Sequence, residues 1–184
     1  MLQHPHPSIV LRTYPAQNIE VTIVVVINAS APERKEDYKY LVNLFKDNPQ
    51  YVFQGYIQST SASKIEKFIK KWTKRGINSI FIIGGTGFEP FDNTPEIMEK
   101  FNQSYIPAYG QLLTLTSYNK WLDTNKNFAI WFPMGTRAFA CKYENTILFS
   151  MPGSHDGILL ASDIIINSLN RIVYNMFYKQ NEKL

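Results

Sequence analysis

A glycine-rich string in the middle of the chain carries the residue types best suited to chemistry. Residues 84–96 read GGTGFEPFDNTPE, and glycines at such a turn let the backbone come close to a ligand. The N–H groups of the turn can cradle a phosphate, and Asp92 is placed to hold Mg²⁺ beside it. The string matches neither the Walker pattern nor the dinucleotide fingerprint, and a tight strand-to-helix turn is the competing interpretation. The cradle would consist of Gly84, Gly85, Thr86 and Gly87.

The elements before this string predict that it lies at the edge of a parallel sheet. Residues 21–27 and 79–83 are unbroken apolar runs, which are typical of strands buried on both faces. The expected order is strand 21–27, helix 34–47, strand 51–57, helix 63–75 and strand 79–83. This βαβ order predicts an α/β fold with right-handed crossovers and helices on both faces of the sheet. Ligands then bind where the strands end, after Ile27 and Ile83.

The second half of the chain is less regular but shows no repeat and no linker. Thr94 is a suitable N-cap for a helix that begins with Pro95 and Glu96. The patterns further predict a helix over 110–121 with a break near Thr116, a strand over 128–132, a hairpin of 137–142 with 146–151, and a helical stripe over 155–178. The expected organisation is an arm at 1–20, a single domain at 21–178 and a polar tail at 179–184.

Composition and charge exclude several classes of protein. Of the 184 residues, 45% are hydrophobic, which excludes a disordered chain. The single cysteine, Cys141, excludes an internal disulfide. No apolar run is long enough to span a bilayer and no secretory signal is visible, so a cytoplasmic protein without a membrane partner is expected. The net charge of +4 comes from 19 Lys and Arg against 15 Asp and Glu. The basic residues of 64–75 lie opposite an apolar helix face, which predicts a solvated surface and no nucleic-acid partner.

Three motifs together resemble the MoaB/MogA family of molybdopterin-binding proteins, which includes gephyrin-type domains. The family signature is Gly-Gly-Thr-Gly, a short loop, Arg-Asp and Thr-Pro-Glu, followed later by a Ser-Arg pair and a Pro-Gly-Ser turn. The matching stretches here are residues 84–96, Thr136-Arg137 and Pro152-Gly153-Ser154. The resemblance covers residues 21–178 and implies a three-layer α/β domain with a mainly parallel sheet, helices on both faces and a small β-hairpin.

The resemblance also implies a reaction, the adenylylation of molybdopterin with Mg-ATP and the release of diphosphate. The pterin's own phosphate would attack, so catalysis would consist of positioning and charge neutralisation. Asp92 would be the catalytic and metal-binding residue. Ligand binding would fall to Gly84, Gly85, Thr86, Gly87, Thr94, Arg137, Pro152, Gly153 and Ser154. The implied partners are other molybdenum cofactor assembly proteins and further copies of the chain, in a homo-trimer or hexamer.

Three positions depart from the family pattern and leave a second hypothesis open. Phe91 stands where the family has an Arg, Ser59 lies where an acid often follows the second strand, and Thr114 aligns with a usual Arg. The leading hypothesis is the adenylyltransferase; the alternative is a non-catalytic pterin- or nucleotide-binding paralogue that keeps the fold. Aromatic residues gathered in 100–121 favour an oligomer interface, namely Phe101, Tyr105, Tyr109, Tyr118 and Trp121.

Overall fold

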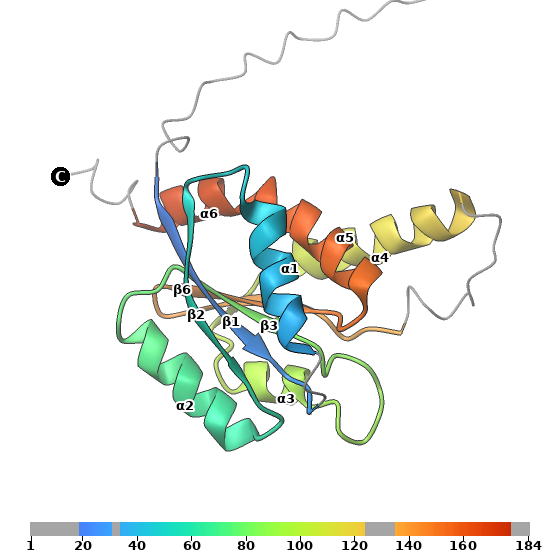
Figure 1. Ribbon diagram of the computed structural model, residues 1–184, viewed down its shortest axis with the longest axis horizontal. Helices are drawn as coiled ribbons and strands as arrows, with labels where there is room; N and C mark the ends of the chain where they lie inside the picture. Colours follow the sequence, from blue (N-terminus) through green and yellow to red (C-terminus); the bar gives the residue numbers. More distant parts are fainter. Residues whose placement is uncertain (1–18, 31–33, 124–134, 178–184) are drawn as a thin grey trace, which may run out of the picture.

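The computed structural model describes residues 19–30, 34–123 and 135–177, and its centre is a six-stranded, mainly parallel sheet (Figure 1). The strand order is β2-β1-β3-β6-β5-β4. The parallel part consists of β1 (Val21–Ile27), β2 (Tyr51–Gln58), β3 (Ser79–Ile83) and β6 (Thr146–Met151). The antiparallel pairs at one edge are made by β5 (Ala140–Tyr143) and the short β4 (Ser104–Tyr105). The hairpin of β5 and β6 was predicted, whereas β4 was not.

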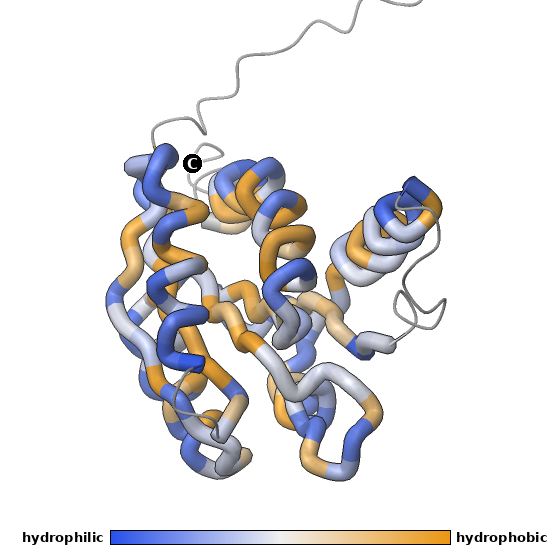
Figure 2. The backbone as a smooth tube through the Cα atoms, turned by 45° about the vertical axis from the view of Figure 1, so that its right-hand side comes forward, coloured by the Kyte–Doolittle hydropathy of each residue, from blue (hydrophilic) through white to orange (hydrophobic). Residues whose placement is uncertain are grey.

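Helices cover both faces of this sheet, which confirms the predicted three-layer α/β class. One face carries α1 (Lys35–Phe45), α4 (Pro107–Asp123), α5 (His155–Ile166) and α6 (Leu169–Phe177), and the other carries α2 (Ala62–Thr73) and α3 (Thr94–Glu99). Successive residues of β1 enter opposite cores, because Val25 packs with the first set and Val26 with the second. Hydrophobic segments run through the strands and along the helices and alternate with hydrophilic ones (Figure 2).

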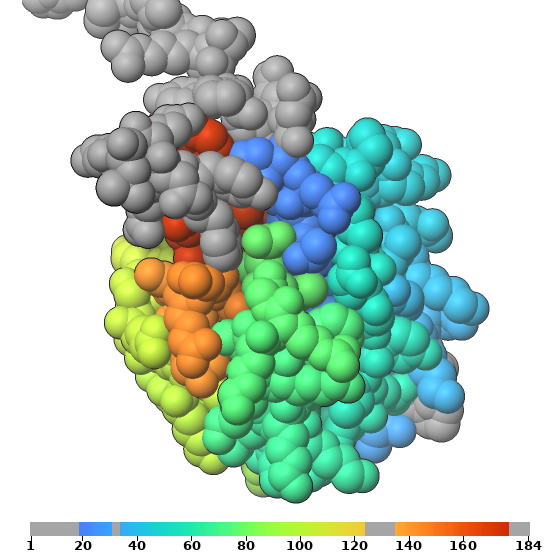
Figure 3. Space-filling view, turned by 90° about the vertical axis from the view of Figure 1, so that its left-hand side faces the viewer, coloured from blue at the N-terminus to red at the C-terminus, as the bar shows by residue number. Residues whose placement is uncertain are grey.

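The basic helix α2 has the two faces that its sequence predicts. Ile65 and Ile69 are fully buried in the second core, whereas Lys64 and Lys67 are exposed. Trp72 is partly buried against the same core. In the space-filling view the segment from α2 to α3, in green, covers this face and the hairpin, in orange, lies beside it (Figure 3). The apolar side of α2 therefore belongs to the fold.

Several boundaries differ from the predictions. The helix predicted over 110–121 is α4, which runs unbroken past Thr116, since one β-branched residue costs a helix only a few tenths of a kcal/mol. The predicted stripe over 155–178 is two helices, α5 and α6, bent by 48°. The Asn167 amide donates to the carbonyl of Asp163 at the bend, in competition with the helix backbone. The predicted arm, the strand over 128–132 and the tail lie outside the described residues, apart from the ends of the arm at 19 and 20.

The described helices give no single membrane span, although α5 and α6 satisfy the length and hydropathy requirements when taken together. Their apolar side chains, such as Ile158 and Val173, are fully buried in the first core. Cys141 is also fully buried, and burial raises the pKa of its thiol to about 12. These groups therefore serve the packing of the domain.

Candidate functional site

Three strand ends meet at the glycine turn. The Gly84 N–H donates to the Met151 carbonyl at 2.9 Å, and the Asn28 N–H donates to the Ile83 carbonyl at 2.8 Å. Gly84 has φ +86°, and a Cβ there would lie 3.0 Å from the carbonyl oxygen of Asn28. A Cβ on Gly153 would lie 3.2 Å from the Gly84 Cα. Both positions need glycine, because the ends of β1, β3 and β6 approach each other too closely for a side chain.

A buried hydroxyl–amide pair holds the turn from behind. The Thr94 hydroxyl donates to the Gly84 carbonyl at 2.7 Å and accepts from the Asn28 side-chain amide at 2.8 Å. The same amide donates to the Asn93 side chain at 2.8 Å. The N-cap of α3 is Asn93, so the predicted N-cap role of Thr94 is wrong: its hydroxyl is taken up by these contacts. Thr94 is fully buried and lies behind the cradle.

Arg137 fastens the other side of the loop. Its Nε donates to the Gly87 carbonyl at 2.7 Å, its Nη2 donates to the Asp92 carbonyl at 2.9 Å, and its Nη1 pairs with Glu96. The hydrogen bond from Arg137 lowers the pKa of Glu96. The guanidinium also lies 5.5 Å from the ring centre of Phe88. The structure thus places Arg137 against the loop backbone. Its Nε and Nη2 donors, which the sequence analysis assigned to ligand binding, are used by the Gly87 and Asp92 carbonyls.

The Asp92 side chain contacts the backbone of its own loop and also faces the cavities. Its Oδ2 accepts from the Glu89 N–H at 2.9 Å, and a Cβ on Gly87 would lie 2.5 Å from that oxygen. The side chain also lines two adjoining cavities. Asp92 therefore combines a structural contact within its own loop with a position on the wall of the cleft.

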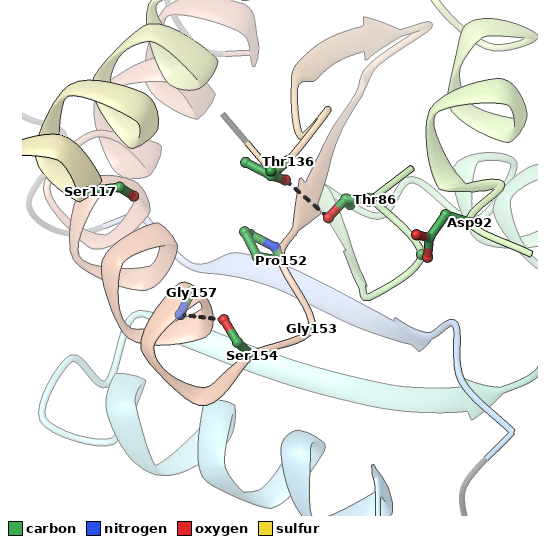
Figure 4. A pocket seen from close by; sticks show the side chains of 11 residues that line it. Thr86, Asp92, Ser117, Thr136, Pro152, Gly153, Ser154 and Gly157 are labelled. Atoms are coloured by element: carbon green, nitrogen blue, oxygen red, sulfur yellow. Dashed lines mark hydrogen bonds between the residues drawn. The ribbon is translucent and has the colours of Figure 1, made fainter. Parts of the chain in front are cut away.

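The first cavity, of about 270 Å³, lies between the two glycine turns and α4. Figure 4 shows Asp92 on one side of it, with Ser117 and Ser154 across from it. Ser154 caps α5, because its Oγ accepts from the Gly157 N–H at 3.1 Å. The wall of this cavity contains most of the predicted site residues, namely Gly85, Thr86, Gly87, Asp92, Pro152, Gly153 and Ser154.

The second cavity, of about 520 Å³, opens on the other side of the same turns. It shares Gly85, Asp92 and Gly153 with the first. The remaining wall consists of Asn28, Ala29, Ser30, Arg34, Thr60, Gly84 and Phe91. Thr94 and Arg137 belong to neither wall. The departures from the family pattern fall at separate places, since Phe91 lines this cavity and Thr114 lies on the exposed side of α4.

Arg34 is a functional candidate that the sequence analysis missed. Its Nη2 donates to the Gly153 carbonyl and lies 2.7 Å from Oδ2 of Asp37, while its buried Nε has no hydrogen-bond partner among the described residues. Burial raises the pKa of Asp37, and the charge of Arg34 opposes that rise. Arg34 therefore brings a cation to the second cavity, where the sequence predicted a loss of charged partners.

Acidic groups are scarce at the site. Within the described ranges, Asp92 is the one carboxylate on the wall of either cavity. No three His, Cys, Asp or Glu side chains of these ranges gather in an arrangement that could hold a metal ion. A divalent cation at this site would thus depend on Asp92 and on oxygen ligands of a bound phosphate.

The sheet, with two glycine turns above adjoining cavities at its carboxyl edge, defines a three-layer α/β protein with a ligand-sized cleft. A family model described as "Probable molybdopterin binding domain" matches residues 38–171. The chain belongs to this family, and within it to the MoaB/MogA type that its motifs predict.

Relatives and solved structures agree with this assignment. Molybdenum cofactor biosynthesis protein B of Staphylococcus aureus (strain Mu50) is 29% identical over 109 residues, 59% of this chain. That alignment spans 61% of the relative, less than two thirds of its length. The Staphylococcus epidermidis protein of the same name is 24% identical over 181 residues, with 96% of this chain and 97% of the relative covered.

Two crystal structures show the same fold. One is of a molybdenum cofactor biosynthesis protein B, with a TM-score of 0.72, 23% identity, and 85% of this chain and 96% of that chain covered. The other is of the tungsten cofactor synthesizing protein MoaB from Pyrococcus furiosus, with a TM-score of 0.70, 16% identity, and 86% and 98% coverage. At these identities the likeness supports the architecture.

Proposed function

We propose that this protein acts in molybdenum cofactor biosynthesis by binding molybdopterin at the carboxyl edge of its sheet. The pterin's phosphate would lie against the glycine turns, where Gly84 and Gly153 carry no side chain of their own and Arg34 lies close to Gly153. The start of α5 follows the second turn, and a helix N-terminus favours an anion. Family membership supports the choice of ligand. The cytoplasm is the location that this role predicts.

The more specific proposal is that the bound pterin is adenylylated with Mg-ATP. A phosphate oxygen of molybdopterin would form a bond to the α-phosphorus of ATP, and the bond from that phosphorus to the bridging oxygen would break. Diphosphate leaves with the bonding electrons. No protein nucleophile is required, so the protein would act by holding two phosphorylated ligands in line and offsetting their charge.

The observation that carries this proposal is the pair of adjoining cavities. They share Asp92 and the two glycine turns, so ligands in each could meet at one wall. The first cavity lies near the lower limit for small-molecule sites, and the second lies well within their usual range, roughly 300–1,000 Å³. Mg²⁺ is commonly held by one or two carboxylates together with substrate phosphates, a role that Asp92 suits.

A binding-only function is the second candidate, and the single acidic residue favours it. A site with one carboxylate could bind pterin or nucleotide without turning either over. The two candidates are separated by measuring diphosphate release from ATP with the purified full chain, molybdopterin and Mg²⁺. Molybdopterin-dependent release of one diphosphate per pterin supports the adenylyltransferase. Saturable binding of pterin or nucleotide without release establishes the binding-only function, and absence of binding of either ligand refutes both candidates.

A further inference from the structure

We propose that the ring of Phe91 stacks on the planar heterocycle of a phosphorylated ligand held in the second cavity. The inference rests on the proposed function and deepens it, since it names the residue that recognises a ring. Phe91 lines that cavity together with Arg34, Asn28 and Asp92. Its side chain is also 74% exposed, which is unusual for a large aromatic residue.

A second phenylalanine in the same loop shows what distinguishes Phe91. Phe88 is similarly exposed, at 71%, but its ring already lies under the guanidinium of Arg137. Phe91 has neither an aromatic nor a cationic partner among the described residues. Phe88 moreover does not line the second cavity. One ring of the loop therefore already has a cationic partner on the protein's surface, and the other is presented to the cleft.

The surroundings of Phe91 fit a ligand with a flat ring at one end and a phosphate at the other. The guanidinium of Arg34 supplies a charge-assisted donor for the phosphate on the same wall. Stacking needs only the face of a ring, and an aromatic side chain offers that face at a small cost in conformational entropy. A pterin and an adenine share this chemistry, and both would place their phosphate toward the glycine turns.

The test compares ligands with and without a ring in the wild type, Phe91→Leu, Phe91→Trp and Phe88→Leu. The probes are neopterin monophosphate, AMP and ribose 5-phosphate, and the measurement is the dissociation constant by calorimetry, with pterin fluorescence as a second readout. Leu keeps an apolar side chain of similar bulk but has no ring face. Phe88→Leu is the matched control, because it removes an equally exposed ring from the same loop. Circular dichroism checks that each variant is folded.

We expect Phe91→Leu to weaken the binding of at least one ring-bearing probe about tenfold, with Phe91→Trp close to the wild type. Ribose 5-phosphate should bind all four proteins equally, and Phe88→Leu should stay within about twofold. An effect on AMP alone assigns the nucleotide ring to Phe91, and an effect on the pterin alone assigns the pterin ring.

The proposal is overturned if Phe91→Leu binds both ring-bearing probes as the wild type does, or if ribose 5-phosphate loses affinity to the same extent. It is also overturned if the wild type binds neither ring-bearing probe. Each of these results leaves molybdopterin binding and diphosphate release by the wild type to be judged separately, so the two proposals fail in distinguishable ways.

Discussion

The side-chain amide of Asn28 donates a hydrogen bond to the hydroxyl of Thr94, 66 residues further along the chain, over 2.8 Å. The Thr94 hydroxyl in turn donates a hydrogen bond to the carbonyl of Gly84. The end of the first strand thus fixes the loop that follows the third. This buried pair therefore positions the cradle from behind.

Asn28→Ala should lower the free energy of unfolding by about 1–3 kcal/mol, because it leaves the buried Thr94 hydroxyl without its donor. Denaturant unfolding measures the loss. Asn102→Ala, which removes an amide hydrogen-bonded on the surface to Glu99, is the control and should change stability by less than about 0.5 kcal/mol. Equal stability of the two variants would contradict the role of Asn28.

Gly85→Ala and Gly76→Ala separate backbone strain from crowding. Both glycines have positive φ, +64° and +77°, so each substitution should cost about 1 kcal/mol from strain alone. A Cβ at Gly85 would also lie 2.4 Å from the amide nitrogen of Asn28, whereas a Cβ at Gly76 meets nothing within 4 Å. Thermal unfolding should therefore show a distinctly larger loss for Gly85→Ala. If Gly85→Ala lost no more stability than Gly76→Ala, the Asn28 side chain would be able to move aside and crowding at Gly85 would carry no cost.

Asp92→Asn tests the metal and catalytic role proposed for this carboxylate. The substitution keeps the size of the side chain and an oxygen that can accept from the Glu89 N–H, but removes the charge. Mg-dependent diphosphate release should fall by roughly a hundredfold or more, while pterin binding survives. If the wild type and the variant bind nucleotide equally with and without Mg²⁺, and neither turns it over, the binding-only function stands.

Arg34→Gln should make stability depend more steeply on pH through Asp37. Burial raises the pKa of Asp37, and Arg34 is the first of the charges that oppose the rise, followed by His155. An acid whose pKa is higher in the folded than in the unfolded protein binds more protons when folded, so stability falls as pH rises between those two values. Removing Arg34 raises the folded pKa further and widens that window upward.

Thermal unfolding of Arg34→Gln from about pH 4 to pH 8 should therefore show a growing deficit relative to the wild type as pH increases. Adding Asp37→Asn should abolish most of that pH dependence, because the titrating group is gone. A deficit that is constant across this range would show that Asp37 is not the responsible group.

The exposed side of α4 is the surface on which we predict self-association. Leu112, Leu115, Tyr118 and Leu122 recur at helical spacing and are 41–55% exposed. Of the aromatic residues predicted at an interface, Phe101 and Tyr109 are buried within the protomer, whereas Tyr105 and Tyr118 are exposed. A further copy of the chain, in a trimer or hexamer, would cover such a stripe.

Leu115→Glu should shift the molecular mass measured by light scattering at micromolar concentration from oligomer to monomer. Ser63→Glu, on the exposed surface of α2, adds the same charge elsewhere and should leave the mass unchanged. A monomeric wild type would refute the prediction outright.

The parallel sheet could be predicted because its strands are short apolar runs buried on both faces. The observed bounds of β1 and β3 are the predicted ones, at 21–27 and 79–83. The break between α5 and α6 could not be predicted, because the apolar stripe continues across it and the sequence gives no signal such as a proline at the bend.

The candidate site was predictable only in part. The glycine turns carry a local signal, and the structure brings 84–87 and 153–154 to one place. Asn28 could have been found from its position directly after the first strand, where ligands of such sheets bind. Arg34 has no comparable signal, because a single arginine before a helix resembles any surface residue. Its importance comes from the approach of Gly153, 119 residues away.

The hydrogen bond from the Gly84 N–H to the Met151 carbonyl sets the order in which the cradle can be built. The last strand among the described residues, β6, lies next to β3 in the middle of the sheet, so one wall of the cleft forms only when the residues near 151 are present. A nascent chain on the ribosome that still lacks β6 would contain the glycine turn at 84–87 but not the second turn, at 153–154, that forms the cleft with it. Ligand capture during synthesis therefore requires that residues 146–154 have left the ribosome and that β6 has paired with β3.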